Sequence, residues 1–543
     1  MAAAGLAALA AASCASPPPT PHASDVYADF LIGRIANARD DYGAASDRYF
    51  AALARSPGDE ALVRGALAAT LVAGDEQRAR RAAAMAPREG APALARLVRA
   101  ADALRASQWS RASRELDGLE GTAVEEMLAR TLDVWVEVGQ RQPDEAVSQL
   151  APLTGVRPYG ALFAYQQAMA LDLSGRRDES LAAYDVAARG EMFVPPAAER
   201  HADALARAGQ RDEALAMLAR VNMARANPAL EAAAARIETG ARARTSLNPA
   251  RAAAIGLYGF GAILLQQEHN ADGGLIALTL ALMLDPQLDS ARLLFAEGHA
   301  DGERYTLARE ALARIGAQSP YAESARIAGA RLLLESGRPD EAVQAAEAIA
   351  ASGDARARRA LADIYSTVDR YADAEPLYSA LLVEDQSNWR LHFARAAARD
   401  SLGRWSEAEA DLRQALVLAP DQPDVMNYLG YTWVDRGENL QEGMALIRRA
   451  AEIRPTSGAI IDSLGWAHYR LGDYRQAVLF LERAVELEPG SSVLNDHLGD
   501  AYWRMGRRTE ARFQWRRALS QQPDDPAAIE AKIANGLPDD ATQ

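Results

Sequence analysis

Residues 459–490 read AIIDSLGWAHYRLGDYRQAVLFLERAVELEPG, and this stretch contains the pattern that decides the fold. In its first half, Ile461 and Leu464 recur at the spacing of one face of an α-helix. Gly472 then suits the left-handed position that follows a helix. A second helical pattern follows, and Pro489 closes it because proline does not continue a helix interior. The stretch therefore predicts two helices joined by a tight turn.

Small residues are expected where these two helices cross closely. Gly465 lies in the first helix and Ala477 in the second, and a large side chain at either position would overpack the contact. Asp473, followed by Gln476, has the character of a helix start.

A small residue at the Ala477 position recurs along nearly the whole chain. It falls on Ala45, Ala79, Ala112, Ala146, Ser180, Ala214, Gly274, Ala308, Ala342, Ala374, Ala408, Gly443, Ala477 and Ala511. The steps are 32–35 residues except for one of 60, which separates Ala214 from Gly274. A period of this length, built from helix patterns, indicates an all-α solenoid, here of about 14 helix pairs. Each pair of such a solenoid packs only against its neighbours.

The long step divides the expected repeats into two arrays. We expect a signal and proline-rich tether at 1–25, an N-terminal array at 26–242, a C-terminal array at 243–526 and a polar tail at 527–543. An alanine-rich helix at 228–242 would form the joint between the two arrays.

The composition excludes several classes of function. With a net charge of −15, the chain is not expected to bind nucleic acid, because it has no basic stripe that would attract the phosphate groups. The single cysteine rules out an internal disulfide. None of the seven histidines forms an HExxH or similar metal-spaced pair, and no nucleophile elbow or Walker loop occurs. We therefore expect no enzyme activity, no metal and no cofactor.

The segment before Cys14 consists of alanine, leucine, glycine and serine after the first methionine. It resembles the end of a bacterial lipoprotein signal, which implies that Cys14 is lipidated and that the membrane is reached only through this anchor. The prolines at 17–19 and 21 would then form an extended tether. The alternative is an alanine-rich tail with an unmodified cysteine. It is suggested by the absence of lysine and arginine before Cys14, since signal peptides usually begin with a positively charged region.

The turn between the helices and the closing proline recur in phase with the small residue. The turn appears at 175–180, 209–214, 337–342, 403–408 and 506–511, and the proline at Pro57, Pro286, Pro320, Pro420, Pro455, Pro489 and Pro523. Together these residues resemble the tetratricopeptide repeat. The resemblance implies a right-handed superhelix in which the first helix of each pair lines the concave groove.

At the groove positions of the last three full repeats, the chain carries aromatic and acidic side chains. These candidate partner-binding residues are Asn427, Tyr431, Asp462, Trp466, Tyr469, Asp496, Asp500 and Trp503. Aromatic side chains with polar tips are good interface anchors. The alternative for Trp466, Tyr469 and Trp503 is packing between helices, which we expect for Trp433, Tyr502 and Trp515.

Residues 424–518 resemble the C-terminal repeats of a group of proteobacterial tetratricopeptide lipoproteins, through the runs 427–436, 461–470 and 497–503. This resemblance implies an outer-membrane lipoprotein facing the periplasm. It would bind a carboxyl-terminal processing protease and present cell-wall hydrolases to it. Two alternatives are an envelope scaffold for polysaccharide or cell-wall assembly and a cytoplasmic adaptor. The partner's identity and the oligomeric state do not follow from the sequence.

Overall fold

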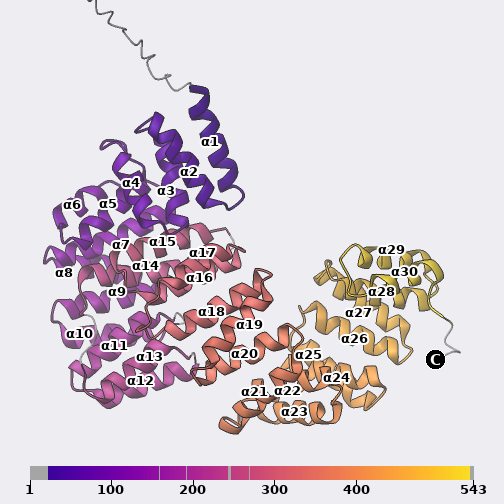
Figure 1. Cartoon of the computed structure of the whole chain (residues 1–543). Coiled ribbons are helices and arrows are strands. Elements are labelled where there is room, and N and C mark those ends of the chain that lie inside the picture. Colours follow the sequence, from indigo (N-terminus) through magenta and orange to yellow (C-terminus); the bar gives the residue numbers. More distant parts are fainter. Residues whose placement is uncertain are drawn as a thin grey trace, which may run out of the picture. The chain divides into compact units, whose positions relative to one another are not determined.

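The computed structural model describes residues 23–157, 159–190, 193–224, 226–241, 246–267 and 269–538. Within these ranges the chain forms thirty α-helices and one 3-10 turn, and no strand (Figure 1). Contacts divide the chain into an N-terminal unit, Met1–Arg338, and a C-terminal unit, Pro339–Gln543. The sequence predicts that two arrays of repeats meet at 242/243, and this position lies inside the N-terminal unit. The division of the repeats into two arrays at this position stays a prediction.

The N-terminal unit contains the first eighteen α-helices and the 3-10 turn η1. They are α1 (Ala23–Asn37), α2 (Tyr42–Arg55), α3 (Glu60–Val72), α4 (Glu76–Met85), α5 (Ala93–Arg105), α6 (Trp109–Leu116), α7 (Ala123–Gly139), α8 (Pro143–Leu150), η1 (Ala151–Leu153), α9 (Gly160–Leu173), α10 (Arg177–Ala188), α11 (Pro195–Arg207), α12 (Arg211–Ala224), α13 (Pro228–Glu238), α14 (Pro249–Leu265), α15 (Ala271–Leu284), α16 (Asp289–Asp301), α17 (Tyr305–Ala313) and α18 (Ala322–Glu335).

The C-terminal unit contains the remaining twelve. They are α19 (Pro339–Ala350), α20 (Ala355–Thr367), α21 (Tyr371–Glu384), α22 (Trp389–Ser401), α23 (Trp405–Leu418), α24 (Pro423–Arg436), α25 (Leu440–Ile453), α26 (Gly458–Arg470), α27 (Tyr474–Leu487), α28 (Ser492–Arg504), α29 (Arg508–Leu519) and α30 (Pro526–Asn535).

The helix pair predicted from residues 459–490 is confirmed as α26 and α27. Gly472 adopts a φ of +76°, and the side chain of Asp473 accepts a hydrogen bond from the Gln476 amide at 3.2 Å. A Cβ on Gly465 would lie 2.7 Å from Cγ of Leu481, and Ala477 is fully buried. The small residues are therefore required by the close approach of the two helices.

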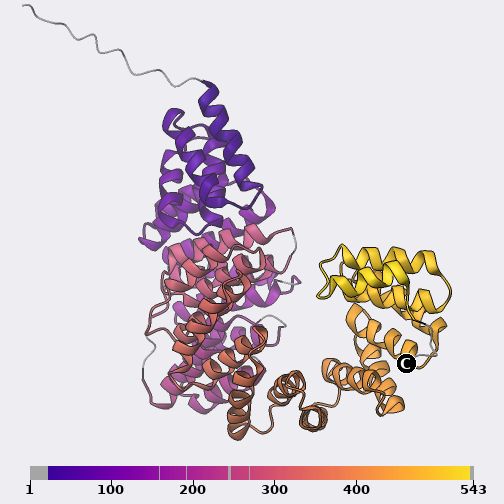
Figure 2. The same cartoon turned by 45° about the vertical axis from the view of Figure 1, so that its right-hand side comes forward.

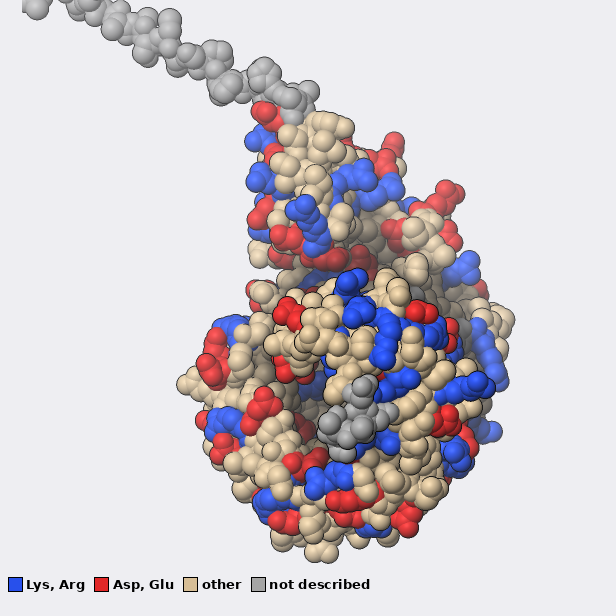
Figure 3. Space-filling view, turned by 90° about the vertical axis from the view of Figure 1, so that its right-hand side faces the viewer, with Lys and Arg blue, Asp and Glu red and all other residues tan. Residues whose placement is uncertain are grey.

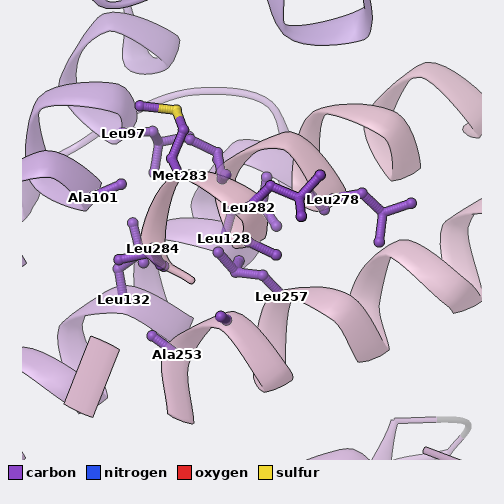
Figure 4. Packing of buried hydrophobic residues seen from close by; sticks show 14 of the residues in the cluster. Leu97, Ala101, Leu128, Leu132, Ala253, Leu257, Leu278, Leu282, Met283 and Leu284 are labelled. Carbon is purple, nitrogen blue, oxygen red and sulfur yellow. The ribbon is translucent and has the colours of Figure 1, made fainter. Parts of the chain in front are cut away.

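In the N-terminal unit, α14 and α15 pack against helices much earlier in the chain. The helix α14 contacts α7 and α9, and α15 contacts α3 and α5 (Figures 1 and 4). Polar contacts join the same elements: Thr279 donates to the Leu71 carbonyl at 2.6 Å, and Arg105 to the Met283 carbonyl at 3.2 Å. A helix that is apolar all round must be buried, and α15 carries Asp272 as its only charged residue. The start of the expected second array thus completes the core of the first repeats.

No helix within the described ranges is long and apolar enough to span a bilayer. In the same ranges, no group of three or more histidine, cysteine or carboxylate side chains is placed to hold a metal ion. Cys14 lies outside the described residues.

Candidate functional site

The eight predicted groove residues lie on three first helices of the C-terminal unit, as seen in the orange and yellow part of Figure 2. The helix α24 carries Asn427 and Tyr431, α26 carries Asp462, Trp466 and Tyr469, and α28 carries Asp496, Asp500 and Trp503. The helix α26 contacts both α24 and α28, so the three helices that carry these residues are neighbours, but Asp462 and Asp500 are buried. The structure thereby places together residues that are up to 76 positions apart in the sequence.

A stack of three rings forms the centre of this surface. The Trp466 ring lies 4.6 Å from that of Tyr469 and 4.1 Å from that of His497, with interplanar angles of 9° and 18°. Arg504 donates to the Tyr469 hydroxyl at 3.3 Å. Trp466 and Tyr469 are half-buried, so the stack packs between helices and also borders the groove surface.

Asp462 and His497 form a buried ion pair across two neighbouring repeats. Nδ1 of His497 lies 2.9 Å from a carboxylate oxygen of Asp462, which is 5% exposed. Burial by itself would lower the pKa of His497, but the carboxylates of Asp462, Asp500 and Asp496 together outweigh burial and raise that pKa above its ordinary value. The charge that Asp462 would present to a ligand is therefore largely neutralised.

Lys532, from the last helix α30, forms ion pairs with the other two acidic groove residues and compensates one of their two charges. Its ammonium group lies 2.7 Å from Asp496 and 2.9 Å from Asp500. Trp515 also donates its indole N–H to Asp500 at 2.8 Å. Burial and the neighbouring Asp496 raise the pKa of Asp500 despite these partners. Burial would lower the pKa of Lys532, but the two carboxylates raise it, so the ammonium stays charged.

Trp503 lies under the segment that follows α30. Its indole N–H donates to the Leu537 carbonyl at 3.3 Å, and the Arg508 guanidinium lies 3.7 Å from the ring centroid. Arg504 donates to the Pro538 carbonyl at 2.8 Å. The chain therefore covers this end of the groove itself, and Trp503 presents less surface to a partner than the sequence pattern suggests.

Three of the predicted groove residues carry a buried polar atom that has no hydrogen-bond partner among the described residues. These atoms are Oδ1 of Asn427, Nε1 of Trp466 and Oδ1 of Asp496. An unsatisfied buried donor or acceptor costs about 1–3 kcal/mol, so such atoms mark places where a ligand would gain most by hydrogen bonding. Tyr431 is half-buried beside them, and burial together with Asp435 and Asp462 raises its pKa to about 12.

Sequence reasoning missed His497, Lys532 and Arg504 as parts of this surface. His497 follows Asp462 by 35 positions, about one repeat, and this spacing could have indicated the ion pair. Lys532 is the only lysine in the chain, but it lies in a terminal helix outside the repeat pattern. The expected core positions are confirmed, since Trp433 is 2%, Tyr502 7% and Trp515 0% exposed.

The ion pair of His497 predicts a pH-dependent contribution to stability. Because the folded state raises the pKa of His497, its contribution is fully present below the unfolded pKa, about 6.5, and is lost as the pH rises through the folded pKa. We expect the loss of unfolding free energy in His497→Gln to be larger at pH 5.5 than at pH 9, measured by urea denaturation. The exposed His269→Gln serves as control. A loss of unfolding free energy that is equal at pH 5.5 and pH 9 would contradict a charged pair between His497 and Asp462.

Comparisons with known proteins identify the repeat. Two tetratricopeptide repeat family models match, one at residues 327–388, 362–423 and 393–458 and the other at 468–536. A Pseudomonas aeruginosa protein named "TPR repeat-containing protein PA4667" is 31% identical over 149 residues, which are 27% of this chain and 25% of that protein. The "Lipoprotein NlpI homolog" of Haemophilus influenzae is 49% identical over 57 residues, 10% of this chain and 18% of its own.

The matches thus span a quarter or less of each relative. Among solved structures, the Cut9–Hcn1 complex of the APC/C aligns with 95% of this chain and 97% of its own, at 14% identity and a TM-score of 0.41. Residues 327–458 and 468–536 thus match tetratricopeptide repeats, and the described residues form an all-α solenoid of helix pairs.

Proposed function

We propose that this protein is a non-catalytic adaptor of the bacterial cell envelope that holds partner proteins in the groove formed by α24, α26 and α28. The observation that carries the proposal is the Trp466 ring stack, bordered by the unsatisfied polar atoms of Asn427, Trp466 and Asp496. Tryptophan and tyrosine are enriched among the few residues that dominate interface energetics. The groove acids are paired internally, which reduces the negative charge that they present to a ligand.

The envelope location is supported by Cys14 in its lipoprotein-like context and by the relative named a lipoprotein. We propose that the partners are a periplasmic carboxyl-terminal processing protease and its peptidoglycan-hydrolase substrates. Such an adaptor acts by proximity, because holding both proteins on one scaffold raises the concentration of each near the other without chemistry of its own. A lipid anchor would confine both to the membrane surface.

Affinity capture of the full-length protein from its host in mild detergent, followed by mass spectrometry, tests the partners. Recovery of a carboxyl-terminal processing protease together with cell-wall hydrolases supports the proposal. Recovery of other envelope machinery without a protease would favour the assembly scaffold. Recovery of cytoplasmic proteins alone would overturn the envelope location.

Substitution of Trp466 tests the groove. Trp466→Phe preserves an aromatic ring in the stack and removes the indole N–H, so we expect capture to weaken about fivefold with little change in melting temperature. Trp466→Ala should weaken capture more than about tenfold. Trp389→Phe, a half-buried tryptophan on α22, is the matched control. If both Trp466 variants capture partners as well as the wild type, the partner binds elsewhere.

Cys14→Ala tests the anchor. If Cys14 carries the lipid, the variant should keep the fold, because Cys14 precedes the first described helix in the sequence, but it should move from the membrane fraction to the soluble fraction. Fractionation in detergent-free buffer, with circular dichroism as the control for folding, measures this. A variant that still sediments with membranes would contradict the proposal that Cys14 carries a lipid anchor.

A further inference from the structure

The last full repeat carries a concentration of positive charge that the rest of this acidic chain lacks. Residues 503–517 contain six arginines and one glutamate, whereas the whole chain has a net charge of −15. Four of these arginines, with Phe513, lie along α29 and are here called the α29 basic face: Arg508, Arg512, Phe513, Arg516 and Arg517. Figure 3 shows the charged side chains on one face of the molecule, where basic and acidic residues are interspersed.

The α29 basic face differs from the earlier second helices in its ion pairing. In α23, Arg413 pairs with Glu409 at 2.9 Å. In α25 and α27 an arginine pairs with a glutamate three positions later, at 3.3 and 3.1 Å. Within the described residues, none of the four arginines of the α29 basic face forms an ion pair.

Three of those arginines contact uncharged groups instead. Arg512 and Arg517 donate to the carbonyls of Ile533 and Pro489, and Arg508 lies over the Trp503 ring. Arg516 is exposed. Backbone carbonyls and a ring leave the charge of a guanidinium uncompensated, so the face keeps its full positive charge toward solvent.

The repeat spacing allows residues of α29 to be compared with those at the equivalent positions of α25 and α27. The helices α25, α27 and α29 start at intervals of 34 residues, so Arg516 in α29 corresponds to Glu482 in α27 and to Arg448 in α25. Phe513 is 62% exposed and corresponds to Leu479, which is 57% exposed, and to Ala445 in α25. A large aromatic side chain is thus left in solvent in the middle of the arginines.

We propose that the α29 basic face docks an acidic protein segment that carries an apolar side chain. Arginine guanidinium groups match carboxylates in a bidentate geometry, and Phe513 provides an apolar anchor between them. At physiological salt the screening length is about 8 Å, so the local charge of this face acts on a ligand more strongly than the acidic remainder of the chain.

A protein ligand fits this face better than a membrane. A helix that lies in a lipid surface needs a continuous apolar side, and Phe513 is the only large apolar side chain of α29 that is strongly exposed. The residues of the α29 basic face belong to the second helix of the last pair and the groove residues to first helices, and the two sets meet where Arg508 lies over the Trp503 ring.

The test uses the full-length protein and a fluorescent synthetic peptide rich in glutamate with leucine at every third or fourth position. Its counterpart with glutamine in place of glutamate reports binding that does not depend on charge. The variant is Phe513→Ala with Arg516→Glu, and both new residues already occur at the equivalent positions of earlier repeats, Ala445 and Glu482. The control is Leu479→Ala with Arg483→Glu, which makes the same change of charge on α27.

We expect the acidic peptide to bind with an affinity that falls as salt rises, and the variant to bind about tenfold more weakly than either the wild type or the control. Trp466→Ala should bind this peptide normally, which separates this proposal from that for the groove. Absence of salt-dependent binding, or equal loss in the variant and the control, would overturn the proposal. So would binding to vesicles of phosphatidylglycerol and phosphatidylethanolamine in preference to the peptide.

Discussion

Leu257→Asp is expected to unfold most of the N-terminal unit, because it places an unpaired charge between helices that are 100 positions and more apart in the sequence. Leu257 is fully buried on α14 and lies near Leu128 of α7 (Figure 4). A buried charge without a partner is among the few single changes that cost more than about 4 kcal/mol. The milder Leu257→Ala should lower the free energy of unfolding by about 3 kcal/mol.

The size of this effect follows from how tightly α14 fits. A Cβ on Gly259 would collide with Cδ1 of Leu162, and one on Gly256 would lie 3.0 Å from the Gln166 side chain. Neighbours packed at this density relax only partly when a side chain is removed, so a cavity remains and adds to the cost.

Urea denaturation and limited proteolysis of the Leu257 variants would measure this loss. Proteolytic cleavage should appear throughout residues 23–338 and spare the C-terminal unit. Leu479→Asp, at an exposed site of α27, is the matched control and should change stability by less than about 0.5 kcal/mol. Wild-type stability in Leu257→Asp would mean that α14 is not part of the N-terminal core.

Lys532→Met should destabilise the last repeats by about 3 kcal/mol, because it leaves two carboxylates without their cation. Asp500 is 5% exposed, and it loses one of its two hydrogen-bond donors when Lys532 is removed. Thermal unfolding followed by circular dichroism, together with tryptophan fluorescence from Trp503 and Trp515, measures the loss.

A second substitution should rescue that loss. Lys532→Met with Asp500→Asn removes one buried charge and should recover a large part of the stability, since the cost comes from the unpaired carboxylate. In the single variant, the raised pKa of Asp500 implies recovery as the pH falls and this carboxyl group is protonated. If the single and double variants are equally unstable, Lys532 contributes through packing of its stem rather than through charge.

Several features of the fold were predictable from local sequence. The turn at Gly472, the helix start at Asp473 and the small residues Gly465 and Ala477 each act within one helix pair, so their signal lies within a few positions. Repetition about every 34 residues made the solenoid class predictable, because the same local pattern returned in phase along the chain. The alignment of the eight groove residues on first helices follows from the same period.

The partners of the groove residues depend on tertiary structure. Lys532 reaches Asp496 across 36 positions, and His497 reaches Asp462 across 35. The packing of α14 and α15 against α3, α5, α7 and α9 likewise joins segments far apart in the chain.

The sequence by itself therefore determined the helix pairs, their turns and the face on which the groove residues lie, because backbone preferences and apolar spacing act over a few residues. Only the tertiary structure decided which carboxylates are neutralised, which aromatic rings stack and which helices complete the first core. Those outcomes depend on side chains that meet after the repeats have packed, and the period of a solenoid specifies its neighbouring contacts but not its long-range ones.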